Sequence, residues 1–155
     1  IYLYPETAGK TSQLGSLEEI LEICEYVDFA RPCLDLAHIH GFERGCLWTA
    51  DAIANVFELV KSIFGSDYLE NVHIHMYPVD FDNNGEKKHK AFSDRIENVQ
   101  LSLEAEAVRD RYYPRPEDFV STIREFNISP VVVCEARDTQ DEGARLMKKL
   151  YYDVK

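Results

Sequence analysis

Side chains of the types that bind metal ions stand at the ends of four apolar segments of this chain. Glu6 follows IYLYP, Asp35 lies in PCLDLA with His38 three residues later, His73 lies in NVHIHMY, and Glu135 closes PVVVC. Carboxylates and imidazoles are ligands of divalent cations. Carboxylates beside apolar runs are costly to bury without a positive partner. The pattern therefore predicts one shared metal site, provided that the segments converge.

The four apolar segments are expected to be β-strands, each followed by a helix. The predicted strands cover residues 1–5, 32–37, 72–77 and 130–134. Apolar residues at helical spacing predict helices over residues 16–27, 53–64, from 116 onward and over 139–152. Alternating strands and helices form right-handed crossovers and a parallel sheet. Because the carboxyl ends of parallel strands lie at one edge, the strand-end residues should meet there.

Four βα units are half of the eight that make an α/β barrel, so the expected fold is α/β, a parallel (βα)4 half of a TIM barrel. A complete barrel typically needs about 250 residues, whereas this chain has 155. We expect residues 1–155 to form a single partial domain, since an open half barrel exposes two strand edges and an apolar face. A preceding segment, a separate chain or a second copy would supply the missing half.

The connection from residue 78 to 114 shows no clean period, although LSLEAEAVRD could form a short helix. A connection of this length is usually functional or mobile. It carries two basic stretches, residues 87–90 and the RDRYYPR segment at 109–115. Arginines interleaved with tyrosines suit phosphate and base contacts, but the net charge of −11 opposes nucleic acid. Solvated surface charge is the favoured interpretation of both stretches.

The four cysteines lack CxxC spacing, which predicts reduced, structural thiols and is consistent with the cytoplasm. No run approaches the roughly 18 apolar residues of a membrane span, so no membrane partner is expected. Among the histidines, His40 and His75 taken singly are more typical of hydrogen-bonded core than of ligands. His38 cannot point with Asp35 along a strand, so a second metal or a substrate phosphate is its expected partner.

At these residues the chain resembles a known family. The segments PETAGKTSQLGSLEEIL, CLDLAHIHGFERG, NVHIHMY and PVVVCEA are similar, in this order, to segments of the endonuclease IV family of xylose-isomerase-like apurinic endonucleases. The resemblance covers nearly the whole chain but only strands five to eight of the family barrel. It implies that the family's remaining histidine ligands lie on strands outside these residues.

The resemblance implies that Glu6 bridges two metals, and that Asp35, His73 and Glu135 complete one of those sites. Glu6 and Glu135 are accordingly the candidates for catalytic residues. The divalent metal implied by the family is zinc, which activates water and stabilises charge on the scissile phosphate.

In the family, the position of His38 binds a third zinc together with an Asp-x-His pair from the following loop. His89 matches the histidine of that pair, but Lys87 stands at the aspartate position. The departure leaves the third metal of this chain open.

Three functions remain at this point. The first is an endonuclease IV-like phosphodiesterase that acts on abasic-site DNA in repair. The second is a sugar isomerase or epimerase of the same superfamily, with Mn or Mg on a small sugar, which the acidity and Lys87 favour. The third is a barrel that binds metal without turnover, because a shared fold does not fix the chemistry.

Overall fold

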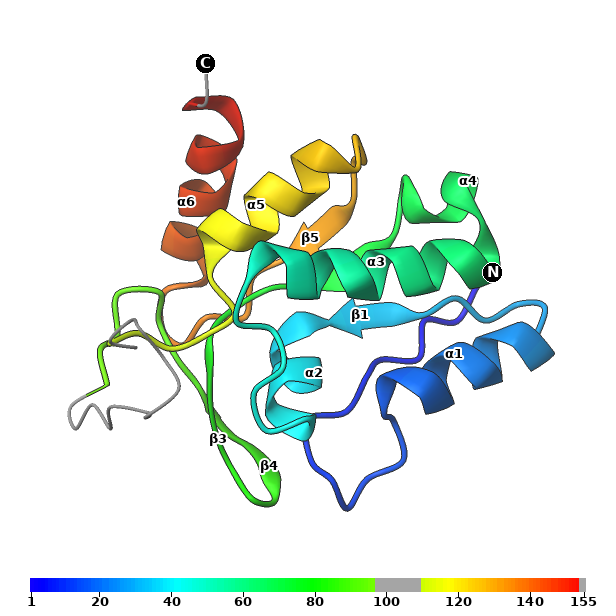
Figure 1. The fold of residues 1–155 in the computed structure, drawn as a ribbon, viewed down its shortest axis with the longest axis horizontal. Coiled ribbons are helices and arrows are strands. Elements are labelled where there is room, and N and C mark those ends of the chain that lie inside the picture. Colours follow the sequence, from blue (N-terminus) through cyan, green and yellow to red (C-terminus); the bar gives the residue numbers. More distant parts are fainter. Residues whose placement is uncertain (97–109, 154–155) are drawn as a thin grey trace.

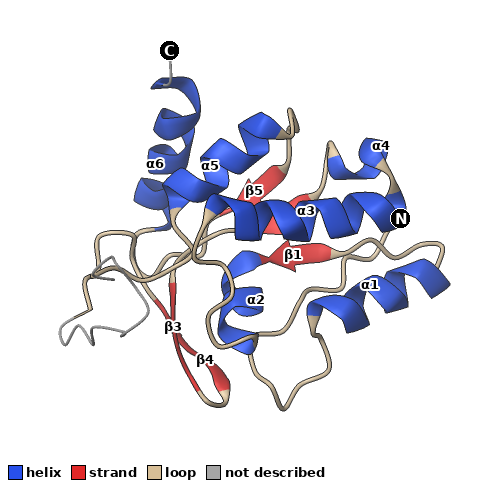
Figure 2. Cartoon of the chain, viewed as in Figure 1, coloured by secondary structure: helices blue, strands red, loops and turns tan. Residues whose placement is uncertain are grey.

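A computed structural model describes residues 1–96 and 110–153 of the chain as an α/β structure with a parallel sheet (Figure 1, Figure 2). In chain order its elements are α1 (Leu17–Tyr26), β1 (Cys33–Asp35), α2 (Leu36–Phe42), α3 (Ala50–Phe64), α4 (Ser66–Leu69), β2 (His73–His75), β3 (Val79–Asp82), β4 (Gly85–His89), α5 (Pro116–Glu125), β5 (Val131–Val133) and α6 (Gln140–Asp153). The expected α/β class, with a parallel sheet and helices, is confirmed.

The parallel sheet has the strand order β1-β2-β5. In its register Asp35 lies opposite His75, and His75 lies opposite Val133. The strand expected over residues 1–5 is reduced to two isolated parallel bridges, which join Leu3 to Ala30 and residue 6 to residue 33. This segment still continues the sheet beside β1, because the Leu3 amide donates to the Phe29 carbonyl at 2.8 Å.

The two faces of the sheet differ. Leu34 and Ile74 are fully buried and belong to the main core with Phe57 of α3 and Phe119 of α5. Since side chains alternate along a strand, the residues on either side of Leu34 and Ile74 face the opposite way. We call this opposite face the site face, because it carries Asp35 and its neighbours.

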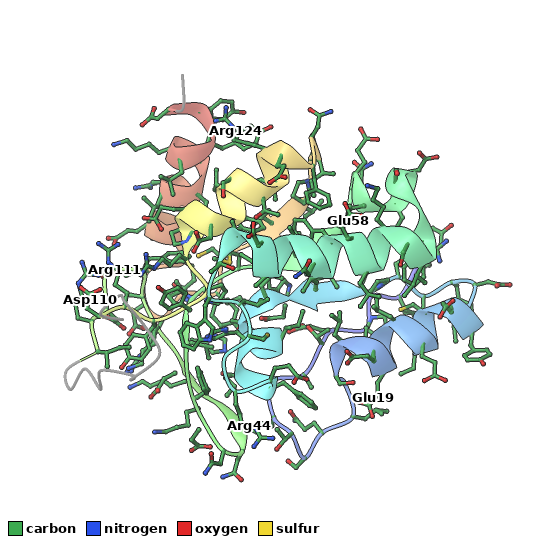
Figure 3. The ribbon with its side chains drawn as sticks, in the orientation of Figure 1. Glu19, Arg44, Glu58, Asp110, Arg111 and Arg124 are labelled. Carbon is green, nitrogen blue, oxygen red and sulfur yellow. The ribbon has the colours of Figure 1, made fainter. Side chains whose placement is uncertain are left out.

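Of the four predicted helices, α1, α5 and α6 begin within one residue of the expected position, and α3 begins three residues earlier than expected. Ser16 and Glu19 form a capping box at the start of α1, and Figure 3 shows Glu19 at that end of the helix. Thr49 caps α3, and Gly65 ends it with a φ of 85°, a conformation that glycine adopts without steric cost. Pro116 opens α5 as expected.

The strand predicted over residues 32–37 is shorter than expected. Asp35 ends β1, and its side chain accepts a hydrogen bond from the His38 amide at 2.8 Å, so it is also the N-cap of α2. Aspartate is a preferred N-cap because it satisfies an amide that the first helical turn leaves free. Residues 36–42, expected as strand end and loop, are therefore helical.

The connection expected to lack regular structure contains an antiparallel hairpin, β3 and β4, which packs against α2 (Figure 1). Its register shifts at a β-bulge: Asp80 pairs with Lys88, and Phe81 pairs with Glu86. Lys87 is thus the extra residue of β4. The short helix considered over residues 101–110 lies, except for its last residue, outside the described residues.

Part of the site face is open in this chain. Val131 and Val133 of β5 are 55% and 36% exposed, and Tyr2 and Tyr4 are about half exposed. All four cysteines are free thiols, as expected. Within residues 1–96 and 110–153, none of the helices has the length and hydropathy needed to cross a membrane.

Candidate metal centre

Three carboxylates converge on one imidazole at the carboxyl ends of the strands. The Nδ1 atom of His75 lies 3.6 Å from Glu6 Oε1, 3.5 Å from Asp35 Oδ2 and 3.6 Å from Glu135 Oε1. Asp35 ends β1 and His75 ends β2, whereas Glu6 lies in the segment before α1 and Glu135 lies two residues beyond β5. We call these four residues the carboxylate centre.

The donor atoms of the carboxylate centre fit a metal ion. Within the described part of the chain, His75 Nδ1 is buried and makes no hydrogen bond. The 3.5 to 3.6 Å separations match the edge of a ligand tetrahedron, which is about 3.4 Å for metal bonds of 2.0 to 2.2 Å. An ion among these atoms would satisfy the buried nitrogen and neutralise the carboxylates.

Asp35 is the most fixed member of the carboxylate centre, with no exposed surface. Its Oδ2 accepts a 2.9 Å hydrogen bond from the Tyr77 hydroxyl, and its Oδ1 accepts the amide of the helix that follows. The Thr7 hydroxyl accepts a 3.0 Å hydrogen bond from the Asp35 amide. Such surrounding hydrogen bonds orient a ligand before a metal binds.

A second group of ligand-type side chains lies beside the first. Glu86 reaches His38 Nε2 with Oε2 at 3.0 Å and His89 Nε2 with Oε1 at 3.2 Å. We call His38, Glu86 and His89 the histidine centre. His38 Nδ1 also lies 3.1 Å from Glu6 Oε1, so this imidazole joins the two centres.

Both imidazoles of the histidine centre are held in the orientation that ligands need. His38 Nδ1 donates to the Thr7 carbonyl oxygen at 2.8 Å, and His89 Nδ1 donates to the Glu135 carbonyl oxygen at 3.0 Å. Hydrogen bonds of this kind from Nδ1 fix the tautomer and leave the lone pair of Nε2 for a metal. The residues of this centre therefore also fit a cation.

The β-bulge explains how the histidine centre exists although Lys87 occupies the aspartate position of the family motif. Without a bulge, residues 86 and 89 would point to opposite faces of the hairpin, since side chains alternate. The extra residue shifts this parity, so that Glu86 and His89 point the same way. Lys87 itself lies 3.8 Å from Asp80 and is more than half exposed.

Two glycines make room for Glu86. A β-carbon on Gly9 would lie 2.8 Å from both Glu86 Cβ and His38 Cδ2, and one on Gly41 would lie 3.1 Å from the Glu86 backbone. Only a residue without a side chain lets the loop after Glu6 and helix α2 approach β4 this closely.

The imidazoles of the two centres partly compensate the charge of the carboxylates. The nearby imidazoles of His38 and then His75 hold the pKa of Glu6 far below its usual range, and His38 also lowers the pKa of Glu86. Burial opposes the charge on His38, but hydrogen bonds to Glu6 and Glu86 outweigh it and raise its pKa to about 11. Asp35, followed by Cys33 and Glu6, raises the pKa of His75 to about 12. Two imidazolium groups thus offset part of the charge of the four carboxylates in the absence of a cation.

Of the six metal ligands expected from the sequence, the structure brings Asp35 and Glu135 together with His75, and Glu6 and Asp35 together with His38. His89 joins His38 as the family resemblance implies. His73 differs from the expectation. The register puts His75 opposite Asp35, whereas His73 lies opposite Cys33, two residues farther from the strand ends.

Sequence reasoning missed Glu86 and Tyr77 and treated His75 as core. The E-x-x-H spacing at residues 86–89 is the signal that could have located Glu86, but its meaning depends on the bulge. Tyr77 follows an apolar strand and is fully buried, so nothing in the sequence separates it from an ordinary core aromatic.

A cleft of about 410 Å³ opens beside the two centres. It is lined by the loop after Glu6, including Lys10 and Gln13, together with His38 and Glu86. The cleft therefore presents a cation and an amide next to the metal-ligand side chains. A ligand lying in it would contact both centres.

The basic stretches around the hairpin have partners on this chain. Lys90 lies over the Tyr112 ring at 4.2 Å, and Arg111 Nη1 lies 4.0 Å from Glu117 Oε1. Figure 3 shows Arg111 and Asp110 on the side of the molecule near the hairpin. These contacts agree with the interpretation of both stretches as surface charge.

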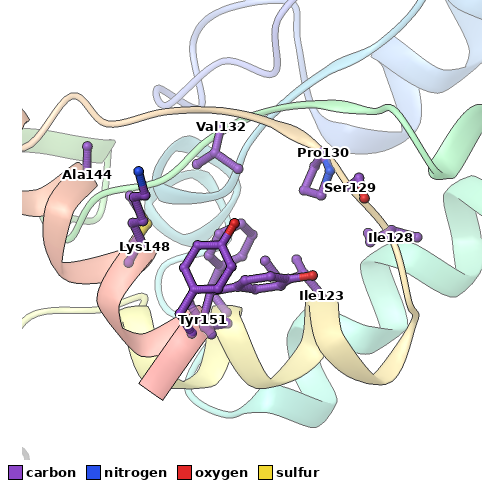
Figure 4. Close-up of a pocket in the computed structure, with 12 residues that line it drawn as sticks. Ile123, Ile128, Ser129, Pro130, Val132, Ala144, Lys148 and Tyr151 are labelled. Carbon is purple, nitrogen blue, oxygen red and sulfur yellow. The ribbon is translucent and has the colours of Figure 1, made fainter. Parts of the chain in front are cut away.

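A cavity of about 390 Å³ between α5, β5 and α6 lies apart from this chemistry (Figure 4). Its lining includes Ile123, Val132 and Tyr151, and of the residues that line it none is an acid, histidine or cysteine. Nothing in this cavity can act as a strong metal ligand or as a general acid or base near neutral pH. This cavity therefore lacks the ligand-type side chains that gather at the strand ends.

Comparison with known proteins adds three findings. A model of the family described as xylose isomerase-like TIM barrel matches residues 1–150. A curated relative, an uncharacterized protein of Methanocaldococcus jannaschii, is 26% identical over 148 residues, which are 96% of this chain and 48% of that protein. The chain thus spans about half the length of this curated relative. No solved structure matches the chain.

Proposed function

The chain belongs to the xylose isomerase-like TIM barrel family, and we propose that it carries half of the active site of a metal-dependent phosphodiesterase that cuts DNA at abasic sites. This family includes both apurinic endonucleases and sugar isomerases. The choice between these activities rests on the number of metal positions that the side chains can build. A shared fold does not make that choice.

The observation that carries the proposal is the presence of two adjoining centres. An isomerase that holds one ion on substrate hydroxyls would need only the carboxylate centre. The histidine centre adds Nε2 atoms of His38 and His89 on either side of Glu86, at 3.0 and 3.2 Å. Neighbouring metal positions are typical of enzymes that displace a group from phosphorus, because both the attacking and the leaving oxygen need stabilisation.

Each residue has a defined part in this proposal. Glu6, Asp35, His75 and Glu135 would hold one ion, which would supply activated water and stabilise charge on phosphate oxygens. Glu6 contacts His75 and His38, and so is placed to bridge. Tyr77 keeps its proton, because burial and then the charge of Asp35 raise its pKa well above the ordinary value. The Tyr77 hydroxyl therefore donates its hydrogen bond to Asp35 and keeps that carboxylate in position.

Lys10 gives the cleft an affinity for anions. It lines the same cleft as Glu6 and His38. Its charge also contributes to the lowered pKa of Glu86, after the larger effects of His38 and His89. A phosphate in this cleft would meet Lys10 on one side and the two centres on the other.

We also propose that four further strands complete the barrel. The exposed site face of β5, with Val131 and Val133, and the half-exposed Tyr2 and Tyr4 form the two open edges. Paired strands would remove both edges and bury the apolar face. A preceding segment, a separate chain or a second copy could supply them, and in the family they carry the remaining histidine ligands.

Acidity favours a second candidate, a sugar isomerase or epimerase that uses Mn or Mg. The chain has a net charge of −11, which repels a DNA backbone more than it repels a neutral sugar. In this function the carboxylate centre would hold one ion on substrate hydroxyls. The histidine centre would then have no part in catalysis.

The deciding experiment incubates the full-length protein with a duplex oligonucleotide that contains one abasic site. With zinc we expect a nick at that site, and a chelator should abolish it. Glu135→Gln should abolish nicking, whereas Glu58→Gln, on the exposed surface of α3 beside Lys61, should retain it (Figure 3). Intact DNA at high enzyme concentration, together with proton exchange on an aldose in heavy water, would support the isomerase instead.

A further inference from the structure

A third group of ligand-type side chains lies deeper on the site face. The sulfur of Cys33 and one ring nitrogen each of His73 and His75 lie within 4.8 Å of one another. Cys33 and His73 are opposite each other in the register of β1 and β2, and His75 follows on the same face. The register of two parallel strands, and not a flexible loop, thus sets their spacing.

These residue types are unexpected at this depth. The interior layers of α/β barrels are usually filled by branched aliphatic side chains, which pack without polar partners. On the opposite, helix-covered face of the same strands, Leu34 and Ile74 are aliphatic and fully buried. Cys33 is only 3% exposed, and its neighbour across the strands is an imidazole. A thiol and two imidazoles at one spot need a polar explanation.

We propose that Cys33, His73 and His75 form a separate position for a thiophilic cation such as Zn²⁺, which we call the sulfur centre. Zinc binds sulfur at about 2.3 Å and imidazole nitrogen at about 2.0 to 2.1 Å, so ligand atoms around it lie about 3 to 4 Å apart. A thiolate with imidazoles selects soft or borderline ions over Mg²⁺ and Mn²⁺. On binding, the thiol proton passes to the solvent.

The sulfur centre is chemically distinct from the carboxylate centre, although they share His75. The carboxylates face Nδ1 of His75 at 3.5 to 3.6 Å, and none of them belongs to the sulfur centre. Replacing Glu135 therefore leaves all three ligands of the sulfur centre in place. Replacing Cys33 leaves all four residues of the carboxylate centre in place.

The test uses Cd²⁺ as the probe, because a bond between cadmium and a thiolate gives a charge-transfer band in the ultraviolet. Metal-free, full-length protein is titrated with Cd²⁺ under reducing conditions. We expect the band to grow to one equivalent, to vanish in Cys33→Ser, and to need at least tenfold more Cd²⁺ in His73→Gln. The control variant Cys46→Ser should leave the charge-transfer band unchanged, because Cys46 lies beside Ile39 of α2 and is not part of the sulfur centre.

Absence of the band in the native protein, or its persistence in Cys33→Ser, would overturn the sulfur centre. His73→Gln guards against a folding defect, because it keeps the thiol and removes only one imidazole. The outcome is separable from that of the proposed function. Glu135→Gln should lose nicking and keep the band, whereas a protein that nicks abasic DNA without any thiolate band has the proposed activity and no sulfur centre.

Discussion

The hydroxyl group of Tyr77 donates a 2.9 Å hydrogen bond to Oδ2 of Asp35, and the ring of the same tyrosine stacks on His89 with centroids 4.2 Å apart. One buried side chain thereby contacts a ligand of each centre. The hydroxyl acts on the carboxylate centre and the ring on the histidine centre, so the two contacts can be removed separately.

Tyr77→Phe should weaken metal binding at the carboxylate centre alone. The variant loses the hydrogen bond to Asp35 and keeps the ring on His89. Loss of such an outer hydrogen bond typically lowers metal affinity by about 10- to 100-fold. Competition with a chromophoric zinc chelator would measure this change. Tyr77→Leu removes both contacts and should weaken metal binding at both centres. Equal effects of the two variants would contradict the assignment of the hydroxyl to the carboxylate centre and of the ring to the histidine centre.

Glu86→Gln should remove the ion of the histidine centre and leave that of the carboxylate centre. Adding Lys87→Asp in the same chain, which restores the aspartate of the family motif, should not recover it. The reason is that the bulge turns residue 87 away, toward Asp80 at 3.8 Å. Metal content per chain by elemental analysis is the readout. Recovery in the double variant would show that residue 87 can reach the centre.

Gly9→Ala should also remove the ion of the histidine centre, because its added methyl group would displace the residues around Glu86. Its β-carbon would lie 2.8 Å from Glu86 Cβ and from His38 Cδ2, so β4 or α2 must move. We expect one metal fewer per chain and an unchanged circular dichroism spectrum. Ala8→Gly, one residue earlier, removes a methyl group in place of adding one and serves as the control. A Gly9→Ala protein with full metal content would mean that the loop after Glu6 accommodates the methyl group without disturbing the histidine centre.

His75→Gln should lower the metal content of the carboxylate centre, whereas His73→Gln should not. His75 Nδ1 faces the three carboxylates at 3.5 to 3.6 Å, and His73 lies two residues farther from the strand ends. Nicking of abasic DNA with saturating zinc separates the two variants. Loss of nicking in His73→Gln with normal activity of His75→Gln would reverse the assignment.

The stability of the metal-free protein should peak between about pH 4.5 and 6.5. The folded pKa values of His38 and His75 are raised from 6.5 to about 11 and about 12, so their stabilisation is complete below pH 6.5 and declines as the pH rises. Glu6 and Glu86 have pKa values lowered from 4.5, so their stabilisation is lost as the pH falls below that value. Thermal unfolding across pH 4 to 9 measures the profile.

Zinc should move that maximum toward neutral pH. Its binding requires imidazoles without the proton that the metal replaces, so the added stabilisation grows as the pH rises. The control is the same titration with Mg²⁺, which prefers oxygen ligands. A melting temperature of the metal-free protein that climbs steadily from pH 5 to 9 would contradict the prediction that protonated His38 and His75 stabilise the fold.

The sequence by itself determined the α/β class, most helix boundaries, and the strand ends at which Glu6, Asp35 and Glu135 stand. These features are local: capping residues, glycine stops and apolar runs act over a few neighbours. The order of the strands then requires that their ends meet. For this reason the convergence of three carboxylates could be expected before any coordinates were known.

Only the tertiary structure decided which further side chains join them. His73 and His75 have the same parity along β2, and the register against β1 alone sets their depth. Glu86 reaches His38 because a bulge in a hairpin reverses the alternation beyond Lys87. Register and bulges depend on contacts between residues far apart in the chain, which a local pattern does not encode.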